Sequence, residues 1–393
     1  MKLRVSLICL CFSMGAGAAS FAFGCDPGPS NIERRQTFYS PVLRVDKIYK
    51  SMQGPIGSIA FDLNSPTPDA SPAPELVWLT GFRSIVVDEE RKQLPQHFMC
   101  HTNLVYRGLG AHREVFRGAS LVNKDKLFTI SQGEEEARFP DGFGIPVVSN
   151  LRGASFGVFN QLLNVNHKDF RDPLRLQYEN TIFYVPESER RRDIRPLYQA
   201  LGQVMVAVNQ DNAIFDMPAP GDLHAQASCS GGDTASPMTF KDRFGQEFSY
   251  HWRLPPGREV RRTLITRTML KLKYDTTIHH IVAHMHPFGE SLALKDLTTG
   301  EVLFQSNMTS YSDRIGVAKV EHYSSAEGIP VYTDHEYALI STYNNTSRET
   351  HDAMAIMYFF LYDKEFRPPD ADALTRARNW QPPPDQHRAM GHM

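Results

Sequence analysis

The sequence contains few cysteines and no segment long and apolar enough to cross a membrane by itself. Five cysteines are spread over 393 residues, too few to form a disulfide-stapled scaffold. An apolar stretch of about ten residues near the N-terminus is too short to span a bilayer, and no other segment is long and apolar enough. No Walker, G-x-S-x-G, H-E-x-x-H or dinucleotide-binding pattern occurs.

The chain also lacks a charge excess and helical periodicity. Its formal net charge of −2 provides no basic surplus to neutralise phosphates, which argues against a nucleic-acid partner. Only Glu187–Met205 suggests a helix, in which Pro196 would occupy the first turn. An aromatic content of 11%, with 26 Gly and 26 Pro, favours a turn-rich β protein.

Strand signals dominate the rest of the chain, and Leu294–Phe304 (LKDLTTGEVLF) predicts a hairpin. We expect an all-β fold of two tandem antiparallel β-sandwich (jelly-roll-like) domains. The expected divisions are a signal peptide at 1–24, an N-terminal sandwich at 36–190, a connector at 191–238, a C-terminal sandwich at 239–366 and a disordered tail at 367–393.

The N-terminus resembles a secretory signal. A short basic start precedes the apolar run Val5–Met14, and small residues at Gly15–Ser20 follow at the spacing that signal peptidase requires. We therefore expect a secreted or periplasmic protein, although a buried first strand is an alternative. The segment ending at Cys25 loosely resembles a lipoprotein cleavage box, and a membrane association is expected only if Cys25 is lipidated.

Export would place the chain in an oxidising compartment. Cleavage would remove Cys9 and Cys11 with the signal. The mature chain would keep Cys25, Cys100 and Cys229, an odd number that allows at most one internal disulfide.

Histidines are concentrated in His279–Glu290 (HHIVAHMHPFGE), which holds four of the chain's 15. On a β-strand, residues i and i+2 point to the same face, so His284 and His286 could both reach one metal ion. His280 shares that face as a possible helper, while His279 should point away. The alternative is a pair of ordinary surface histidines.

A sulfur donor lies downstream in Ser341–Tyr362 (STYNNTSRETHDAMAIMYFFLY), where one strand ends and another begins with Met354. A thioether is a soft ligand that prefers copper(I), while imidazole binds copper in both oxidation states. Two histidines and one methionine could hold copper through a redox cycle. The alternative is that Met354 belongs to the core.

The order H-x-H, then Met, then Tyr four residues later resembles the second domain of the copper type II, ascorbate-dependent monooxygenases. The segments FYSPVLRVDKIY, GPIGSIAFD and SIVVDEERKQLPQHFMCHTNLVY resemble the opening of the related stress-up-regulated nodulin family. This resemblance implies that His284, His286 and Met354 are copper ligands and that Tyr358 orients the reacting groups.

The resemblance also implies a second copper in the first domain, but the sequence departs from that pattern. One histidine, His101, stands where the family has a pair, and Thr102 takes the other place. His167 lies one residue late, with Asn166 in the expected position, and such a shift turns a side chain to the other face of a strand. The site is either rebuilt or lost. Possible substitutes are His97 and Cys100.

Two substitutions alter the implied substrate pocket. Peptide-amidating enzymes have an arginine where this chain has Val282 and an asparagine where it has Ile356. A buried carboxylate needs a paired cation, so we expect a more apolar substrate than a peptide ending in free glycine. His251 is expected at the surface.

These observations lead to three functional hypotheses. The first is a secreted copper-dependent monooxygenase that hydroxylates a C–H bond of an unknown small molecule or peptide with a reductant such as ascorbate. The second is a non-catalytic extracytoplasmic copper-binding or stress-response protein. The third is a structural β-sandwich module with surface histidines.

Overall fold

The computed structural model describes residues 30–50, 53–63, 73–107, 115–116, 126–151, 155–208, 239–242 and 244–378. Within these ranges the chain forms strands β1 to β24 and only short helical segments. The all-β sandwich prediction is confirmed. None of the described helices is long and apolar enough to cross a bilayer. The predicted signal peptide, Cys25 and Cys229 lie outside the described residues.

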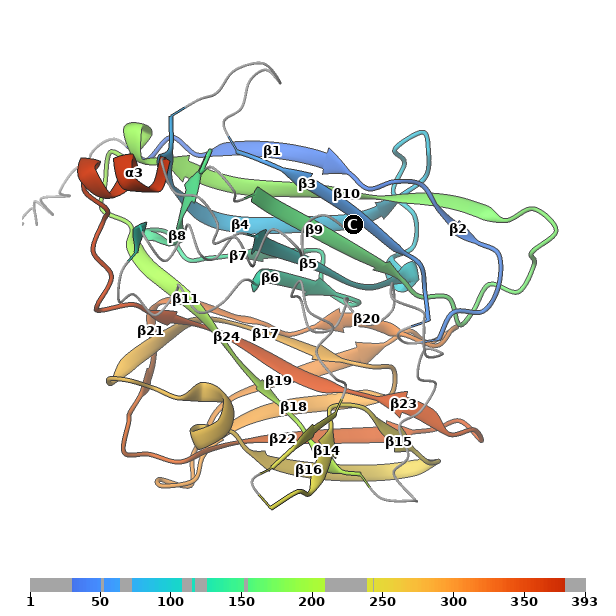
Figure 1. Ribbon diagram of the computed structural model, residues 1–393. Coiled ribbons are helices and arrows are strands. Elements are labelled where there is room, and N and C mark those ends of the chain that lie inside the picture. The colour runs from blue at the N-terminus through green and yellow to red at the C-terminus, as the bar shows by residue number, and fades with distance from the viewer. Residues whose placement is uncertain are drawn as a thin grey trace, which may run out of the picture. The chain divides into compact units, whose positions relative to one another are not determined.

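The first sandwich is built from two facing groups of strands, drawn in the upper part of Figure 1. One group has the order β1 (Arg34–Tyr39), β10 (Leu174–Pro186), β4 (Glu75–Val87) and β8 (Phe143–Ser149), with the short strands β2 (Leu43–Val45) and β7 (Glu136–Arg138) at its side. The other has the order β3 (Ile56–Phe61), β9 (Ser155–Leu162), β5 (Met99–Arg107) and β6 (Lys126–Ser131).

The second sandwich pairs two further groups of strands. One has the order β11 (Arg195–Gln203), β24 (Ala355–Tyr362), β17 (Thr276–Met285) and β21 (Tyr323–Val331). The other has the order β16 (Gly257–Leu264), β22 (Tyr337–Asn345), β18 (Gly289–Asp296), β19 (Val302–Ser310) and β20 (Val317–Val320). Small sheets are formed by β12 (Val206–Ala207), β14 (Glu247–Ser249) and β13 (Thr239–Lys241), and by β15 (Trp252–Leu254) and β23 (His351–Ala353).

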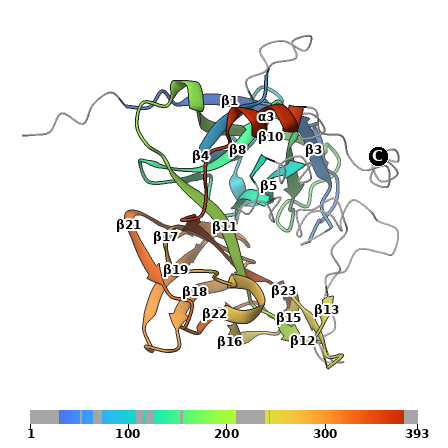
Figure 2. The same cartoon turned by 60° about the vertical axis from the view of Figure 1, so that its left-hand side comes forward.

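Strand β11 joins the two sandwiches into one continuous sheet. Its first residues pair in parallel with β8, Arg195 opposite Phe143 and Pro196 opposite Gly144. The remainder pairs with β24 in antiparallel fashion, and Figures 1 and 2 show it running from the upper strands into the lower ones. The helix predicted over Glu187–Met205 is therefore wrong: only a 3₁₀ turn, η3 (Glu187–Glu189), precedes the strand.

Tertiary pairing explains this error, because two neighbouring strands supply the hydrogen bonds that a helix would have made internally. Pro196 lies at the start of β11, where a strand tolerates proline. The predicted connector, 191–238, thus begins with a strand, and its residues 209–238 lie outside the described ranges. The predicted tail also begins with regular structure, helix α3 (Ala371–Arg378).

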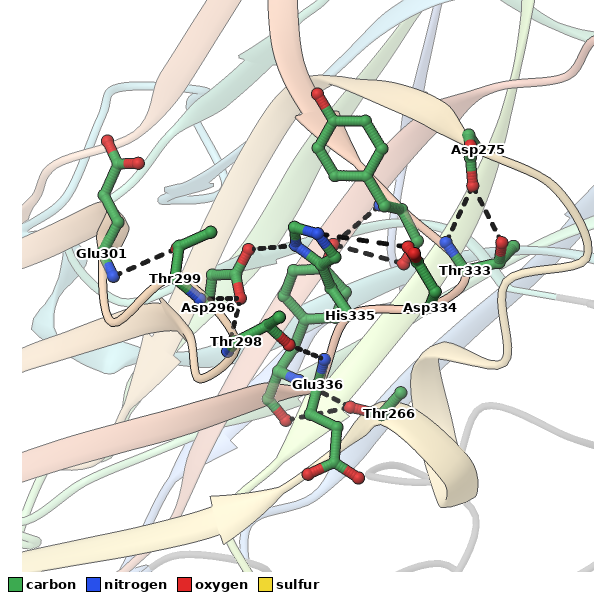
Figure 3. Close-up of polar contacts among 12 residues, drawn as sticks. Thr266, Asp275, Asp296, Thr298, Thr299, Glu301, Thr333, Asp334, His335 and Glu336 are labelled. Carbon is green, nitrogen blue, oxygen red and sulfur yellow. Dashed lines mark hydrogen bonds and ion pairs between the residues drawn. The ribbon is translucent and has the colours of Figure 1, made fainter.

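The predicted hairpin is confirmed as β18 and β19, with Leu294 opposite Phe304. Gly300 has a φ of 82°, a conformation that glycine adopts without steric cost. Asp296 closes the turn: its Oδ1 accepts hydrogen bonds from the N–H groups of Thr298 (2.8 Å) and Thr299 (3.2 Å). Its Oδ2 lies 2.6 Å from Nδ1 of His335, a contact drawn in Figure 3.

Replacing Asp296 by Asn should lower the free energy of unfolding at neutral pH by about 1–3 kcal/mol, because a charged hydrogen bond to His335 is lost. Burial would raise the pKa of Asp296, but its hydrogen bonds to His335 and to the turn N–H groups outweigh burial and hold that pKa below its usual value. This stabilisation is present above the ordinary carboxyl pKa and is lost as the pH falls through the lowered one. Urea unfolding at neutral and acidic pH measures both effects.

Asp334→Asn is the matched control, because the Asp334 side chain is 86% exposed. It should change the unfolding free energy little at either pH. An equal loss in the Asp296 and Asp334 variants would contradict the assigned role of Asp296.

Candidate metal centre

The H-x-H pair lies at the end of strand β17. His284 is the penultimate residue of that strand, and His286 follows directly after its last residue. The centroids of the two imidazole rings are 5.2 Å apart. Both side chains are buried, so the pair is not an ordinary surface feature.

Met354 lies where the chain leaves β23 and enters β24. Its carbonyl accepts hydrogen bonds from the Tyr343 hydroxyl at 2.5 Å and from the His286 N–H at 3.2 Å. Because backbone groups of the two segments are paired directly, Met354 is held beside the end of the histidine-bearing strand.

A small cavity brings Met354 and His284 together with the first sandwich. Its volume of about 10 Å³ is the space of roughly one water molecule. His101 reaches it from β5, and its ring centroid is 6.2 Å from that of His284. The wall consists of His101, Lys126, Thr129, His284, Met354, Ile356 and Tyr358.

A second group of donors joins His286 from the other side. Asp352 Oδ2 lies 2.9 Å from Nδ1 of His286 and 2.9 Å from Nδ1 of His251. One ligand atom from each of the three residues lies within 4.8 Å of the others. Among the described histidines, cysteines and acids, this is the only set of three or more that meets this criterion. We refer to His101, His251, His284, His286, Asp352 and Met354 as the junction cluster.

The expectation that His251 lies at the surface is wrong, since its side chain is 1% exposed. It precedes β15, whose Trp252 pairs with Ala353 and whose Arg253 pairs with Asp352. This pairing of segments about 100 residues apart buries the histidine. The sequence held one signal for Asp352, because it stands two residues before Met354. Two side chains at that spacing lie on one face of an extended chain.

Burial and neighbouring groups give two members of the junction cluster, His284 and Asp352, the protonation states that a metal ligand needs. Burial, followed by the neighbouring His286 and His101, holds the pKa of His284 well below its ordinary value. Its imidazole is therefore neutral, and its Nδ1 has no hydrogen-bond partner. Burial alone would raise the pKa of Asp352, but His251 and His286 together outweigh it and lower that pKa, so the carboxylate stays ionised.

The other histidines proposed for the first domain are not assembled with His101. The Nδ1 atom of His97 lies 3.3 Å from Nη1 of Arg314, and burial, reinforced by Arg314, lowers the pKa of His97 to about 4. The ring of His167 packs near Phe170. The ligand atoms of His97, His101 and His167 do not all lie within 4.8 Å of one another.

The structure shows what Asn166 and His167 do instead of binding a metal where the resemblance expects a ligand. The Asn166 amide donates to the Ile315 carbonyl at 2.8 Å, and the Ile315 N–H donates to Asn166 Oδ1 at 3.0 Å. Asn166 therefore faces the second sandwich. This is the position at which the resemblance would place a copper ligand. His167 instead adopts a backbone position fixed by its N–H bond to Asn164 Oδ1 at 2.9 Å.

A β-bulge changes the direction of Cys100. The pairing of β5 with β9 shifts register between Met99 and His101, and a bulge re-aims side chains. As a result, Cys100 Sγ and His101 Nδ1 are 3.3 Å apart, although neighbours on a regular strand point to opposite faces.

His280 does not serve as the expected helper beside His284. A register shift between Ile278 and His280 interrupts β17. The His280 ring packs against Phe139 and Phe360, with centroids 5.6 Å and 5.5 Å away. His279, expected to be an ordinary residue, packs against the first sandwich and lies outside the junction cluster.

A larger cavity of about 430 Å³ leads to the junction cluster, a size typical of small-molecule sites. His284, His286 and Asp352 form part of its wall together with Cys100. Apolar wall residues are Ile48, Leu163, Val165, Met285 and Ile315. Exposed wall residues are Lys50, Lys168, Arg348 and Glu349, which mark the side open to solvent.

Comparisons with known proteins give no family assignment: no family model and no curated protein matches the sequence. A structure comparison matches the chain to a solved peptide-N(4)-(N-acetyl-β-D-glucosaminyl)asparagine amidase, with 8% identity, a TM-score of 0.31, and coverage of 86% of this chain and 98% of that one. It also matches the chain to PNGF-II, with 8% identity, a TM-score of 0.27, and coverage of 84% and 65%. These likenesses carry no argument about function.

Asp352→Asn should weaken metal binding at the junction cluster about 10–100-fold, because the carboxylate orients both His251 and His286 or binds the ion with them. Competition with a chelator of known affinity measures the change. Glu349→Gln, in the exposed wall of the same large cavity, is the control and should leave the affinity unchanged. Equal affinities of wild type and Asp352→Asn would refute the role of Asp352.

Proposed function

We propose that the protein is an extracytoplasmic copper-dependent monooxygenase that hydroxylates a C–H bond of an apolar substrate, using an external reductant such as ascorbate. The observation that carries this proposal is the position of buried His284, which shares the wall of the small cavity with Met354 and the wall of the cavity of about 430 Å³ with His286. The resemblance to the copper type II monooxygenases names these same residues as ligands.

The donor set fits copper. Neutral imidazoles bind both copper oxidation states, and the Met354 thioether favours copper(I). The buried Nδ1 of His284, which has no hydrogen-bond partner, is a polar group for which an ion would provide the missing partner. Copper, when bound, would supply the one-electron redox and dioxygen chemistry.

The chain's own residues would hold and shield the reaction. Asp352 would fix the His286 ring through its contact with Nδ1, as carboxylates do for metal-bound histidines. Tyr358, the candidate catalytic residue, shares the wall of the small cavity with His284. Lys126 Nζ lies 5.5 Å from the centroid of its ring. The buried side chains around this cavity would keep bulk water from the reacting centre.

An apolar substrate follows from the residues beside the histidines. Val282 is buried in β17 opposite Tyr358, and Ile356 lies in the wall of the small cavity. Neither can pair with a buried carboxylate. These two positions therefore supply no cation for a free glycine carboxylate, and the cation in the small-cavity wall, Lys126, lies over the Tyr358 ring.

The site His251–His286–Asp352 favours a second candidate function. Two histidines and one carboxylate form a ligand set typical of non-haem iron(II) oxygenases and resemble some catalytic zinc sites. In that case the metal would lie on the Asp352 side of His286, and Met354 would not be a ligand. Non-catalytic copper binding remains the alternative if copper binds without turnover.

Metal analysis followed by oxygen-uptake measurements tests the proposal. The purified mature protein should retain copper in preference to iron and zinc, and it should consume oxygen when reductant and an apolar substrate are both present. Copper retention without oxygen uptake across a broad substrate panel would rule out the oxygenase. Preferential retention of iron or zinc would favour the second candidate.

Met354→Ile should weaken copper(I) binding by at least about tenfold, since the soft sulfur ligand is lost, and should leave copper(II) binding by the histidines largely intact. Titrations with copper(I)- and copper(II)-selective chelators measure the two affinities. Met357→Ile is the matched control, because Met357 is likewise buried, three residues further along in β24, but is absent from the walls of both cavities. An unchanged copper(I) affinity in Met354→Ile would show that the assigned ligand is wrong.

A further inference from the structure

Glu134 is a buried carboxyl group without a hydrogen-bond partner. It lies on the turn after β6 and is 7% exposed, and neither of its carboxyl oxygens has a hydrogen-bond partner. Burial raises the pKa of Glu134 to about 8. A buried polar group left unsatisfied in this way indicates a missing partner such as an ion.

One histidine lies beside this carboxyl group, and a second histidine lies beside the first. His322 Nδ1 is 3.8 Å from Glu134 Oε1, a distance longer than a hydrogen bond. The ring of His322 has its centroid 5.8 Å from that of His280. Burial, followed by the neighbouring His322, lowers the pKa of His280 to about 3. His280 is therefore a neutral imidazole, which is the form that binds metals.

The three groups do not place one ligand atom each within 4.8 Å of one another as they stand, so sharing one ion requires His322 to move. Ligands at about 2.0–2.1 Å from Zn²⁺ in tetrahedral geometry lie roughly 3.4 Å from one another, and two imidazoles on one ion have ring centroids at most about 6 Å apart. The observed 3.8 Å and 5.8 Å are close to these values. His322 is 49% exposed, so its side chain can rotate to close the remaining gap and admit the ion from solvent.

The three donors come from both sandwiches. Glu134 follows a strand of the first sandwich, and the carbonyl of its neighbour Gly133 accepts a hydrogen bond from the Val320 N–H at 3.0 Å. His280 belongs to β17 of the second sandwich, and His322 stands between β20 and β21. An ion held by all three would cross-link the two sandwiches.

We propose that Glu134, His280 and His322 form a structural site for a divalent transition-metal ion, separate from the junction cluster. Two imidazoles and one carboxylate are ligands that suit Zn²⁺. Binding would displace the proton of Glu134 into solvent and leave both histidines neutral, and water would complete the coordination on the exposed side of His322. A ligand that binds only the folded state stabilises it.

Zn²⁺ alone is the probe, and the full chain carrying Asp352→Asn is the background, because this change weakens the other candidate site. In that background, Glu134→Gln should bind one equivalent of Zn²⁺ fewer and should lose the rise of a few degrees in Tm that saturating Zn²⁺ produces. Without metal, Glu134→Gln should be at least as stable as its parent, because it removes an unsatisfied carboxyl. A variant that loses the Zn²⁺-dependent rise in Tm but keeps its stability without metal has lost a ligand, whereas a damaged fold would be less stable in both conditions.

His322→Gln should lose the same equivalent as Glu134→Gln. Glu136→Gln is the matched control, because its side chain is 39% exposed, and it should keep both the Zn²⁺ equivalent and the rise in Tm. Retention of the equivalent in both Glu134→Gln and His322→Gln would overturn this site. The junction cluster is tested separately by the copper stoichiometry of Met354→Ile. A negative result for the Zn²⁺ site therefore does not count against the junction cluster, and the reverse also holds.

Discussion

The burial of strand β24 on both faces is the constraint on which the rest of the site depends. Its alternating residues Tyr358 and Phe360 meet the first sandwich, where Phe360 packs 5.6 Å from Phe128 and 4.9 Å from Phe139 between ring centroids. The intervening residues, Met357 and Phe359, are fully buried. A strand covered on both sides needs apolar residues at nearly every position, which explains the run Ala355–Tyr362.

Polar groups in this contact are removed from water, and their chemistry changes accordingly. His284 and His280 become neutral because their protonated forms are poorly solvated. Asp352 stays ionised because two imidazoles lie within reach. Glu134 has the half-exposed His322 at 3.8 Å instead, and its buried oxygens lack hydrogen bonds. Asp352 is thus a buried carboxylate held by two imidazoles, whereas Glu134 is a buried carboxyl group without a hydrogen bond.

The sequence predicted those features that depend on local periodicity. Alternation and turn residues identified the all-β class and the hairpin of β18 and β19, and the i, i+2 spacing predicted that His284 and His286 lie close together, as their 5.2 Å ring separation shows. It failed where pairing between distant segments decides the outcome, as in β11, whose helical appearance is overridden by β8 and β24. His251 and Asp352 meet only because β15 pairs with β23, and the bulge at Cys100 has no sequence signature of its own.

The orientation of His286 decides which metal site the junction cluster can form. Nδ1 of this ring faces Asp352 Oδ2 at 2.9 Å, and a single ring nitrogen cannot both donate a proton to a carboxylate and bind an ion. If Nδ1 carries the proton, Asp352 orients the ring and Nε2 is the ligand, an arrangement compatible with His284 and Met354. If Nδ1 binds the ion, Asp352 and His251 become its co-ligands and Met354 is not needed. The two candidate functions are therefore alternatives for one imidazole, and its tautomer determines whether the site presents sulfur or carboxylate to the metal.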